Sequence, residues 1–439
     1  MKILYIIPWI PYPLNSGGNQ AFYNMVNAVR KEYQVSLLLC PHTSGDRNNV
    51  SELKKIWRDV DIDCYDKRHS NLSNEICLSK SDQRKSKFYT YIEKSMKRKQ
   101  KRLFRDAYQH IDKNSISKEQ FLGMFVQGHA DLYEYIEDFD NSFLEYIYTK
   151  TRQGYDIVQI EFYEYLPLVY VLPDDVKKVF VHHELRFVRN QNEISLFDEV
   201  KPIDYFRFER QKDAEIAALQ RFDNILVASD VDRNILSKYL PEQKIYVSPF
   251  AVSVTGSDQS LSFKAAKDLV FVGSGGHFPN ADGILWFSMY VVPLLISRGF
   301  AGNIFVTGNW GSNIKDLINQ YCSNVKFIGF VDDIHEFLNG KITIVPIRIG
   351  SGMRMKIMDA IPSYSPIVTT SKGCEGIPLQ DEKDCFIKDT PEDFAEAIIE
   401  LLKDANIQKS IATSAFESAK GMMDTESLLK RRLDFYKLC

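Results

Sequence analysis

The sequence lacks any cysteine pair with the spacing of a metal or redox site. Its seven cysteines are scattered along the chain and form no C-x-x-C motif, which argues against a zinc or thioredoxin-type centre and fits a reducing cytoplasm. Long hydrophobic runs are missing as well. The longest one, Ile284 to Ile296, contains Pro293 and is shorter than the ~20 residues that span a bilayer. We therefore expect no bound metal and no transmembrane helix.

An excess of charge of one sign is also missing. The 55 Lys and Arg residues nearly balance the 58 Asp and Glu residues, so the chain has no overall field that would attract a polyanion, and nucleic acid is not expected as a partner. The 44% hydrophobic content is typical of a folded protein. At 439 residues the chain is well above the length of about 150 residues usual for one domain. Two or three domains are expected.

Short apolar runs alternate with longer helical patterns, which predicts βαβ units and parallel sheets covered on both faces. The polar, Ser-rich stretch from Ser248 to Lys267 separates two such series and reads as a linker. We expect an amino-terminal α/β domain over 1–250, a second over 251–420, and a helical tail over 421–439 that could return to the first. The expected strands are Ile3–Ile7, Val35–Leu39, Ile157–Ile160, Val179–Val181, Ile225–Ala228 and Ile245–Val247, then Leu269–Val272, Ile304–Thr307, Val325–Ile328, Ile342–Val345 and Ile367–Thr369.

A segment over about 80–150 interrupts this alternation and is expected to be a helical insertion. From Arg84 to Arg105 it carries ten Lys or Arg residues against Glu93 alone, with apolar residues on one helical face. Such a helix can lie on an anionic membrane surface. It can equally pack its apolar stripe on the domain and leave a solvated basic face. Both interpretations remain open.

The stretch PIRIGSGMRMKIMDA, Pro346 to Ala360, carries the most chemistry. A buried strand ends there, a loop with Gly350 and Gly352 follows, and a helix is expected to begin near Met353. A Gly-containing turn of this kind lets the backbone approach a ligand and offers free N–H groups to a phosphate. On the helix, Lys356 and Asp359 fall on the face of Gly352. This face could hold a nucleoside diphosphate, with the lysine at the phosphates and the carboxylate at ribose hydroxyls.

That stretch resembles the donor-site motif of glycosyltransferase family 4, whose members have two Rossmann-like domains facing across a cleft, the GT-B fold. FVGSGGHFPNADGILWF (Phe271 to Phe287), VTTSKGCEGIP (Val368 to Pro378) and NSGGNQ (Asn15 to Gln20) resemble other family segments in the same order along the chain. The resemblance implies a retaining transfer from a nucleotide sugar without a metal ion. Two departures stand out: Asp359 is found where the family has a second glutamate, and the uncharged Ser351 where it has the first.

The resemblance also implies roles for individual residues. Arg354 and Lys356 would neutralise the diphosphate, with Arg348 as a further candidate, and His183 would contact the transferred sugar beside Glu184, which could orient it. Arg354, Lys356 and His183 are thus the expected catalytic residues. The expected donor-binding residues are Gly17, Gly18, Gly273, Arg348, Gly350, Ser351, Gly352, Met353, Asp359 and Glu375.

Three polar residues follow the strand that ends near Ile160, at the edge where open α/β sheets bind ligands. Glu161, Tyr163 and Glu164 could hydrogen-bond acceptor hydroxyls, although ordinary solvation of the edge explains them as well.

We therefore expect a glycosyltransferase that moves a sugar from a nucleotide diphosphate to a hydroxyl of a glycan or lipid-linked acceptor, in cell-envelope polysaccharide or glycoconjugate synthesis. It would work in the cytoplasm, with peripheral contact at the inner face of the membrane through Arg84 to Arg105 as an option. A nucleotide-sugar epimerase or hydrolase of the same fold, and a non-catalytic protein that binds sugar nucleotides, remain alternatives.

Overall fold

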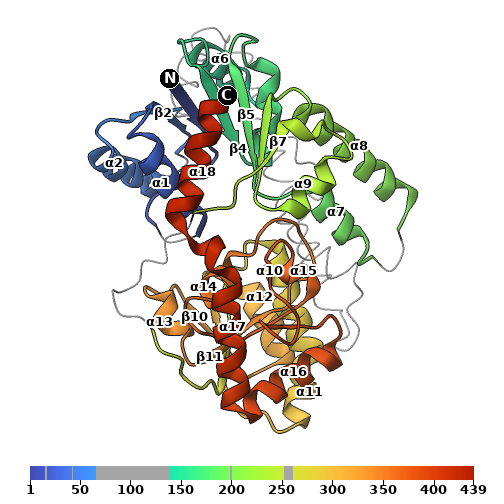
Figure 1. Ribbon diagram of the computed structural model, residues 1–439. Coiled ribbons are helices and arrows are strands. Elements are labelled where there is room, and N and C mark those ends of the chain that lie inside the picture. The colour runs from blue at the N-terminus through green and yellow to red at the C-terminus, as the bar shows by residue number, and fades with distance from the viewer. Residues whose placement is uncertain (15–16, 42, 66–138, 198–199, 252–260) are drawn as a thin grey trace.

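The computed structural model describes residues 1–14, 17–41, 43–65, 139–197, 200–251 and 261–439 (Figure 1). Two parallel sheets form separate α/β layers, one in each half of the chain, which confirms the predicted fold class. The basic stretch from Arg84 to Arg105 lies outside the described residues, as does most of the expected insertion. Of that insertion the structure describes 139–150, which contains α6 (Asn141–Lys150).

The amino-terminal sheet has the order β3-β2-β1-β4-β5-β6-β7, and all of its pairings are parallel. Its central strands are rich in Ile, Val and Leu and buried on both sides, as a sheet covered by helices on both faces requires. Its two faces carry separate apolar clusters. The strands are β1 (Lys2–Ile6), β2 (Gln34–Leu39), β3 (Asp61–Cys64), β4 (Ile157–Glu161), β5 (Lys177–His182), β6 (Asn224–Val227) and β7 (Ile245–Val247).

The carboxy-terminal sheet has the order β10-β9-β8-β11-β12-β13 and is also parallel. One apolar cluster that includes β8, β9, β11 and β12 forms its core. The strands are β8 (Asp268–Phe271), β9 (Ile304–Thr307), β10 (Val325–Gly329), β11 (Lys341–Val345), β12 (Ile367–Thr369) and β13 (Phe386–Ile387).

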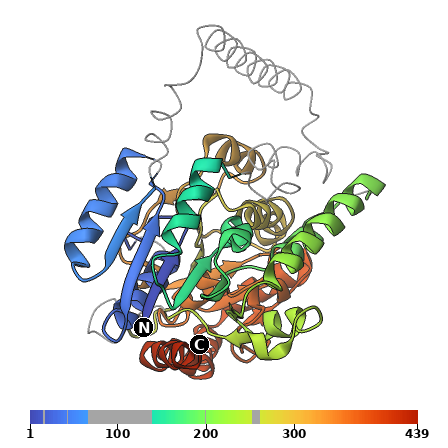
Figure 2. The same ribbon diagram turned by 90° about the horizontal axis from the view of Figure 1, so that it is seen from above.

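Helices connect the strands of both sheets and cover their faces (Figures 1 and 2). In the amino-terminal half these are α1 (Gly17–Val29), α2 (Ser44–Ile56), α6, η2 (Tyr163–Val171), α7 (Arg186–Ile194), α8 (Pro202–Leu219), α9 (Asp230–Leu236) and η3 (Glu242–Lys244). In the carboxy-terminal half they are α10 (Phe278–Trp286), η4 (Phe287–Val291), α11 (Val292–Ser297), α12 (Ser312–Tyr321), α13 (Ile334–Leu338), α14 (Met355–Ala360), α15 (Ser371–Cys374), α16 (Pro391–Lys403), α17 (Ala405–Met423) and α18 (Thr425–Leu438).

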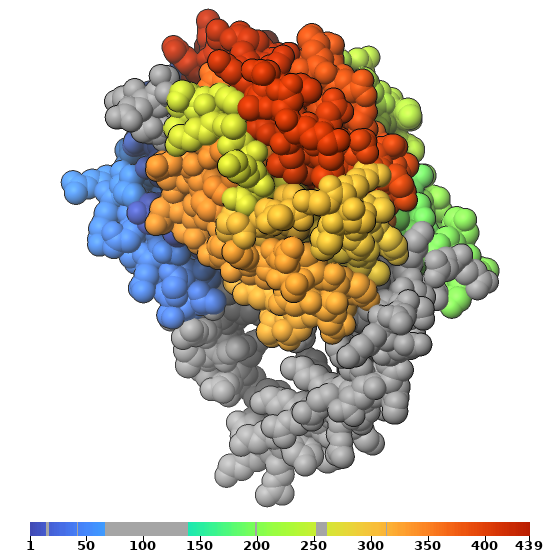
Figure 3. Space-filling model, turned by 90° about the horizontal axis from the view of Figure 1, so that it is seen from below, coloured from blue at the N-terminus to red at the C-terminus, as the bar shows by residue number. Residues whose placement is uncertain are grey.

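The chain crosses between the two halves twice. The first crossing lies between β7 and β8, and the second lies at Asp424, which caps α18. Helix α17 packs on the carboxy-terminal core through residues such as Ala415 and Ala419. Helix α18 runs back to the amino-terminal domain (Figure 1), where Phe435 and Tyr436 join its core. Seen from below, the carboxy-terminal domain fills the centre of the molecule, and parts of the amino-terminal domain show at its sides (Figure 3).

Within the described residues, the continuous helical stretch Phe278–Ser297 is long and apolar enough to cross a membrane by length and composition. However, 67% of its most apolar window is buried inside the carboxy-terminal domain. It packs there as a core helix.

Candidate active site

The loop between β11 and α14 lies in the seam between the two domains. Gly350 and Gly352 have φ angles of 115° and 76°, which side-chain-bearing residues rarely adopt. A Cβ atom at Gly352 would lie 2.5 Å from the carbonyl oxygen of His183, in the opposite domain. The glycines therefore let the backbones of two domains approach each other directly.

Polar contacts fix the loop in this position. The Ser351 hydroxyl accepts a hydrogen bond from the backbone N–H of Leu185 at 2.5 Å, and the backbone N–H of Gly350 donates to the side chain of Asn192 at 3.2 Å. Ser351 is 2% exposed. This serine, which replaces a glutamate of the family pattern, thus joins the loop to the amino-terminal domain.

The two predicted cations of the motif are oriented differently. Arg354 is buried, and its guanidinium donates to the carbonyl oxygens of Ser351, Gly352 and Ile349. Its burial lowers the pKa of the guanidinium, and its Nε has no partner among the described residues. Arg354 therefore braces the loop from inside.

Lys356 turns toward the first strand-to-helix connection of the carboxy-terminal domain. Its Nζ donates to Asn280 Oδ1 at 3.0 Å and lies 5.2 Å from the centre of the Phe271 ring. Burial, reinforced by the charge of Arg354, lowers the pKa of Lys356 to about 7. Asn280 also donates to the carbonyl oxygen of Ser274, so it links this lysine to that connection.

Asp359 follows one turn later on α14 and is half-buried. Burial raises the pKa of its carboxyl to about 6, against the opposing charges of His335 and Lys356. Arg348 is held by a two-pronged ion pair: its Nε and Nη2 donate to the fully buried Asp282 at 3.1 and 2.6 Å. Its contact with a donor stays a prediction, as does the contact of Asp359 with ribose.

The predicted glycine turns border the same seam. Gly17 is the first residue of α1, and a Cβ there would lie 3.3 Å from Met355 at the start of α14. The amino-terminal ends of two helices, each a positive dipole end, therefore meet. Gly18 has open space around its Cβ position, whereas a Cβ at Gly273 would lie 2.7 Å from the Asn280 amide. Met353 is buried in the carboxy-terminal core.

His183 lies just beyond β5 and is held on several sides. Its Nε2 is 2.8 Å from the carboxylate of Glu161 at the end of β4. Its ring stacks on Phe162 at 4.2 Å and on Phe250 at 4.9 Å, and it meets the edge of Trp9 at 5.8 Å. The imidazole is thus positioned by a buried carboxylate and by aromatic rings.

Glu184 does not bond His183, contrary to the expectation from the sequence. Its Oε2 pairs with Arg189 at 3.2 Å, while its Oε1 is buried with no partner among the described residues. Burial alone would raise the pKa of this carboxyl, yet the charges of Arg189 and His277 hold it well below its usual value. A Cβ at Gly350 would lie 2.9 Å from the same Oε1. An ionised carboxylate therefore faces the glycine loop from the amino-terminal domain.

Glu375 reaches the seam from the end of α15. Its Oε2 accepts from Lys372, and its Oε1 is buried with no partner in the part of the chain that is described. A Cβ at the next residue, Gly376, would lie 2.8 Å from Ser229 in the amino-terminal domain. Glu375 is therefore placed near the domain boundary, and its role stays a prediction.

The three residues expected to bind an acceptor are already engaged. Glu161 is 2% exposed and accepts from both His183 and Gln159. The Tyr163 hydroxyl accepts from Arg186 at 3.2 Å, and Glu164 lies in the first turn of η2 and also has a partner. In this structure Glu161 thus forms a hydrogen bond with His183. Acceptor binding by Glu161, Tyr163 and Glu164 stays a prediction.

A hollow of about 400 Å³ is lined in part by Trp9. It lies at the carboxyl ends of β1 and β2, where ligands of open α/β sheets bind. Aromatic rings and amide or carboxylate groups share its wall, a combination suited to sugar rings and their hydroxyls. The lining residues are Pro8, Trp9, Ile10, Tyr12, Pro13, Asn19, Cys40, Asp46 and Asn49.

Sequence reasoning missed several residues of this site. Trp9 and Tyr12 follow the first strand, and a search for aromatic residues after predicted strands would have found them. Phe250 lies at the start of the predicted linker, and no local pattern indicates that it stacks on His183. No group of three His, Cys, Asp or Glu residues that could hold a metal ion occurs in the described ranges.

The chain is similar in sequence and in fold to known proteins. Residues 266–404 match the family model described as glycosyl transferases group 1. A curated relative from Klebsiella pneumoniae, an uncharacterized 44.6 kDa protein in the cps region, is 27% identical over 169 residues. That match covers 37% of this chain and 44% of the relative, so it spans less than half of the relative's length.

Solved structures resemble nearly the whole chain. TarM from S. aureus, as a mutant in complex with Fondaparinux, alpha-GlcNAc-glycerol and UDP, has a TM-score of 0.61 at 11% identity and 99% coverage of both chains. HepE from Anabaena, with UDP and glucose, has 0.60 at 11% identity and 100% coverage of both. Sucrose-phosphate synthase from Thermosynechococcus elongatus has 0.61 at 14% identity, covering 100% of this chain and 99% of its own. The chain has the GT-B fold of these proteins, and together with the family match over 266–404 this supports a group 1 glycosyltransferase.

Proposed function

We propose that the protein is a retaining glycosyltransferase that moves a sugar from a nucleoside diphosphate to a hydroxyl group of a glycan or lipid-linked acceptor. One observation carries this proposal: the glycine loop with Lys356, the amino-terminal ends of α1 and α14, and the Glu161–His183 pair converge on one interdomain seam. The first two groups suit an anionic leaving group, and the third suits a sugar hydroxyl.

The charges of the site match the charge that such a reaction develops. In the transition state the sugar carbon becomes cationic while negative charge grows on the departing diphosphate. Fixed donors aimed at that charge usually supply the largest catalytic contribution. Lys356 and the amide groups at the helix ends would stabilise the diphosphate, and Arg354 would keep the loop in shape. These groups supply positive charge without a metal ion, and the closed seam would exclude water from the donor.

The hollow beside Trp9 provides a place for the acceptor. Trp9 contacts both the hollow and the ring of His183, so an acceptor stacked on this indole would bring a hydroxyl close to the sugar-contacting histidine. The aromatic surface and the nearby Asn49 suit a carbohydrate acceptor better than a purely hydrophobic one.

The known relatives suggest a setting for this reaction. HepE was solved with UDP and glucose, and the Klebsiella relative is encoded in a cps region. By analogy we propose a role in cell-envelope polysaccharide or glycoconjugate synthesis. The site of action would be the cytoplasm, with peripheral contact at the inner face of the membrane through the basic segment Arg84 to Arg105.

A two-step experiment tests the proposed function. Thermal shift with a panel of nucleoside diphosphates and their sugars identifies the donor, and product analysis then follows that donor with and without a glycan extract. Transfer to the acceptor with retained anomeric configuration is the expected result. Epimerised or hydrolysed donor in the absence of acceptor would favour the epimerase or hydrolase alternative, and binding without turnover would favour a non-catalytic protein.

Trp9→Ala provides a separate test of the acceptor site. It should raise the KM for the acceptor at least tenfold and leave the KM for the donor unchanged. A rise in donor KM instead would place the donor, and not the acceptor, at this indole.

A further inference from the structure

A chain of buried hydrogen bonds joins His183 to the last helix of the protein. His183 Nε2 lies 2.8 Å from Glu161, the other oxygen of Glu161 accepts from Gln159 Nε2 at 2.8 Å, and Gln159 Oε1 accepts from the Tyr436 hydroxyl at 2.5 Å. The Tyr5 hydroxyl donates to that of Tyr436 at 3.2 Å. Apart from His183, whose side chain is 13% exposed, the members of this hydrogen-bond chain are buried. Water is therefore largely excluded from the connection.

The donors in this chain all point toward Glu161. An ionised carboxylate can only accept hydrogen bonds, so Gln159 must present its NH₂ group and His183 must present a protonated Nε2. The amide oxygen of Gln159 then faces Tyr436. Burial raises the pKa of both Tyr5 and Tyr436, so their hydroxyls keep the protons that they donate. The hydrogen bonds from Tyr5 through Tyr436 and Gln159 thus point toward Glu161, and His183 donates to Glu161 from the opposite side.

Aromatic rings hold the imidazole in place at the other end of the chain. Phe162, directly after Glu161, has a positive φ of 69°, a conformation that is costly for a bulky residue. Its ring stacks on His183 in this conformation, and Phe250 covers the imidazole with a second stacked contact. Strained backbone of this kind is found where the surrounding structure fixes a functional side chain.

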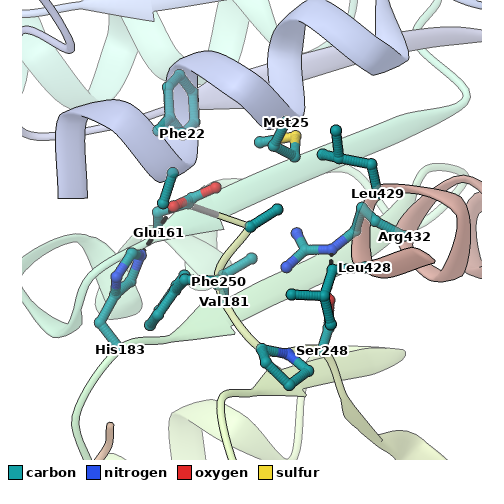
Figure 4. A pocket seen from close by; sticks show the side chains of 13 residues that line it. Phe22, Met25, Glu161, Val181, His183, Ser248, Phe250, Leu428, Leu429 and Arg432 are labelled. Carbon is teal, nitrogen blue, oxygen red and sulfur yellow. Dashed lines mark hydrogen bonds and ion pairs between the residues drawn. The ribbon is translucent and has the colours of Figure 1, made fainter. Parts of the chain in front are cut away.

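The helix that supplies Tyr436 also lines the cavity next to Glu161 and His183. Figure 4 shows Glu161 and His183 on one side of this cavity and Arg432 of α18 on the other, with Phe22 and Met25 of α1 above them. Arg432 is fixed by its hydrogen bond to Ser248 at 2.9 Å. Thus α18 contributes both a cation and a hydrogen-bond donor to the surroundings of the histidine.

We propose that the Glu161 carboxylate, which Gln159 and His183 share, holds the imidazole as its Nε2–H tautomer with an unprotonated Nδ1, and that Tyr436 of α18 supports this arrangement by fixing the orientation of Gln159. Tyr436, Gln159 and Glu161 are positioning residues in this scheme. Nδ1 has no hydrogen-bond partner among the described residues, so its lone pair is free to accept from a ligand.

The ligand group follows from this tautomer. An unprotonated Nδ1 accepts a hydrogen bond and cannot donate one, so it selects a hydroxyl group of the substrate over a carbonyl or a phosphate oxygen. Naming a sugar hydroxyl as this group rests on the proposed function. The tautomer itself does not, and it can be measured on the resting protein.

The tautomer is tested by nitrogen NMR of the full-length protein with ¹⁵N-labelled histidine, at about pH 8, where histidine side chains are ordinarily neutral. The signals of His183, one of eight histidines, are those lost in His183→Gln. In the unaltered protein we expect a protonated Nε2 and an unprotonated Nδ1. In Glu161→Gln, the new amide must turn its oxygen to the NH₂ group of Gln159 and its own NH₂ group to the histidine. The protonated nitrogen should therefore switch to Nδ1.

The role of α18 is tested by adding Tyr436→Phe, which removes one hydroxyl and keeps the ring. In Glu161→Gln with Tyr436→Phe, Gln159 is free to rotate, so we expect a mixture of both tautomers in place of the full switch. Tyr33→Phe is the matched control, because Tyr33 packs on Tyr436 but lies outside the chain. Added to Glu161→Gln, it should leave the switch complete. An unchanged tautomer in Glu161→Gln, or the same switch with and without Tyr436→Phe, would overturn the proposal.

A kinetic measurement separates this inference from the proposed function. In Glu161→Gln we expect kcat to fall at least tenfold while the donor KM stays within about twofold. If no turnover is found with any donor, the proposed function fails while the tautomer result still stands. If turnover is found but Glu161→Gln keeps the normal kcat, the substrate contact at Nδ1 is wrong.

Discussion

Lys356 and Asp359, one turn apart on α14, both ionise near neutral pH. Burial and the charge of Arg354 lower the pKa of Lys356 to about 7, and burial raises the pKa of Asp359 to about 6. Both side chains are expected to hold the proposed donor. Their charge states therefore depend on small changes of pH that leave most other side chains unaffected.

We predict that the affinity for the nucleotide sugar is highest between about pH 6 and pH 7. Below about pH 6, Asp359 gains a proton and can no longer accept from ribose hydroxyls. Above about pH 7, Lys356 is neutral in the free protein, so binding must take up a proton, and affinity should fall by at most about tenfold per pH unit. Isothermal titration calorimetry across this range measures both limbs.

Two variants assign these limbs. Lys356→Arg keeps its charge and should flatten the alkaline limb, whereas Asp359→Asn should weaken binding and flatten the acid limb. Affinity that is independent of pH in the unaltered protein would contradict both assignments.

At Gly352 the backbones of the two domains approach each other closely. We predict that Gly352→Ala lowers turnover at least 100-fold, because its Cβ would lie 2.5 Å from a backbone oxygen that cannot move aside. Its positive φ adds a cost of about 1–2 kcal/mol. Gly154→Ala is a matched control: Gly154 has a similar φ of 71° with no atom near its Cβ position. It should lose some stability and keep its turnover. Equal turnover in the two variants would show that the contact with His183 is dispensable.

Part of this site could be predicted from the sequence. The motif order and the resemblance indicated His183, and the strand pattern placed Glu161 at the same edge of the sheet. The bond between them could not be foreseen, because it depends on side-chain directions at the ends of two neighbouring strands. Ser351 likewise reads as a lost carboxylate in the sequence, whereas in the structure it is a hydrogen-bonding contact between the domains.

At the scale of elements, the loop before α14 is tied to α10 through Arg348 and Asp282. The carboxylate is fully buried, and the arginine side chain is 26% exposed. Removal of one partner leaves a buried charge without its main counterpart, which commonly costs about 3–5 kcal/mol. The pair therefore fixes how the loop leaves β11.

We predict that Arg348→Met lowers the thermal unfolding midpoint by several degrees and that adding Asp282→Asn restores most of the loss. Thermal denaturation followed by circular dichroism measures both variants. If Arg348→Met weakens donor binding and leaves the midpoint unchanged, this arginine is a donor ligand and not a support of the loop.

The strands show where sequence patterns are sufficient. Every strand that was predicted is present, and most of them are runs of Ile, Val, Leu or Phe buried between helices. The two that were missed, β3 and β13, are edge strands. Strand β3 alternates charged and apolar residues, and β13 has only two residues. The other two edge strands, β7 and β10, were predicted, so the weak signal of β3 and β13 comes from their charged or very short sequences and not from the edge position alone.

At the scale of the whole molecule, each domain has its own large apolar core, and the two domains meet through polar and glycine contacts and through a small apolar cluster of Phe278, Ile349, Leu196 and Phe197. We predict two calorimetric transitions, since such domains commonly unfold independently. Donor at about 100 times its Kd should stabilise the carboxy-terminal one by about 2.7 kcal/mol. Lys356→Ala should abolish this shift. A single transition with a midpoint that is the same with and without donor would contradict the assignment of the donor to the carboxy-terminal domain.

The two crossings of the chain are fastened side by side. Arg431 and Arg432, just after the second crossing, donate to Val247 and Ser248, just before the first, at 3.2 and 2.9 Å. Both bonded ends belong to the amino-terminal half, so the two connections leave that half from one common point, and a sliding movement of the other half would have to stretch both connections. Rotation about that point disturbs them least. Substrate entry and product exit should accordingly proceed by swinging one half away from the other, with the same few residues acting as the pivot in each cycle.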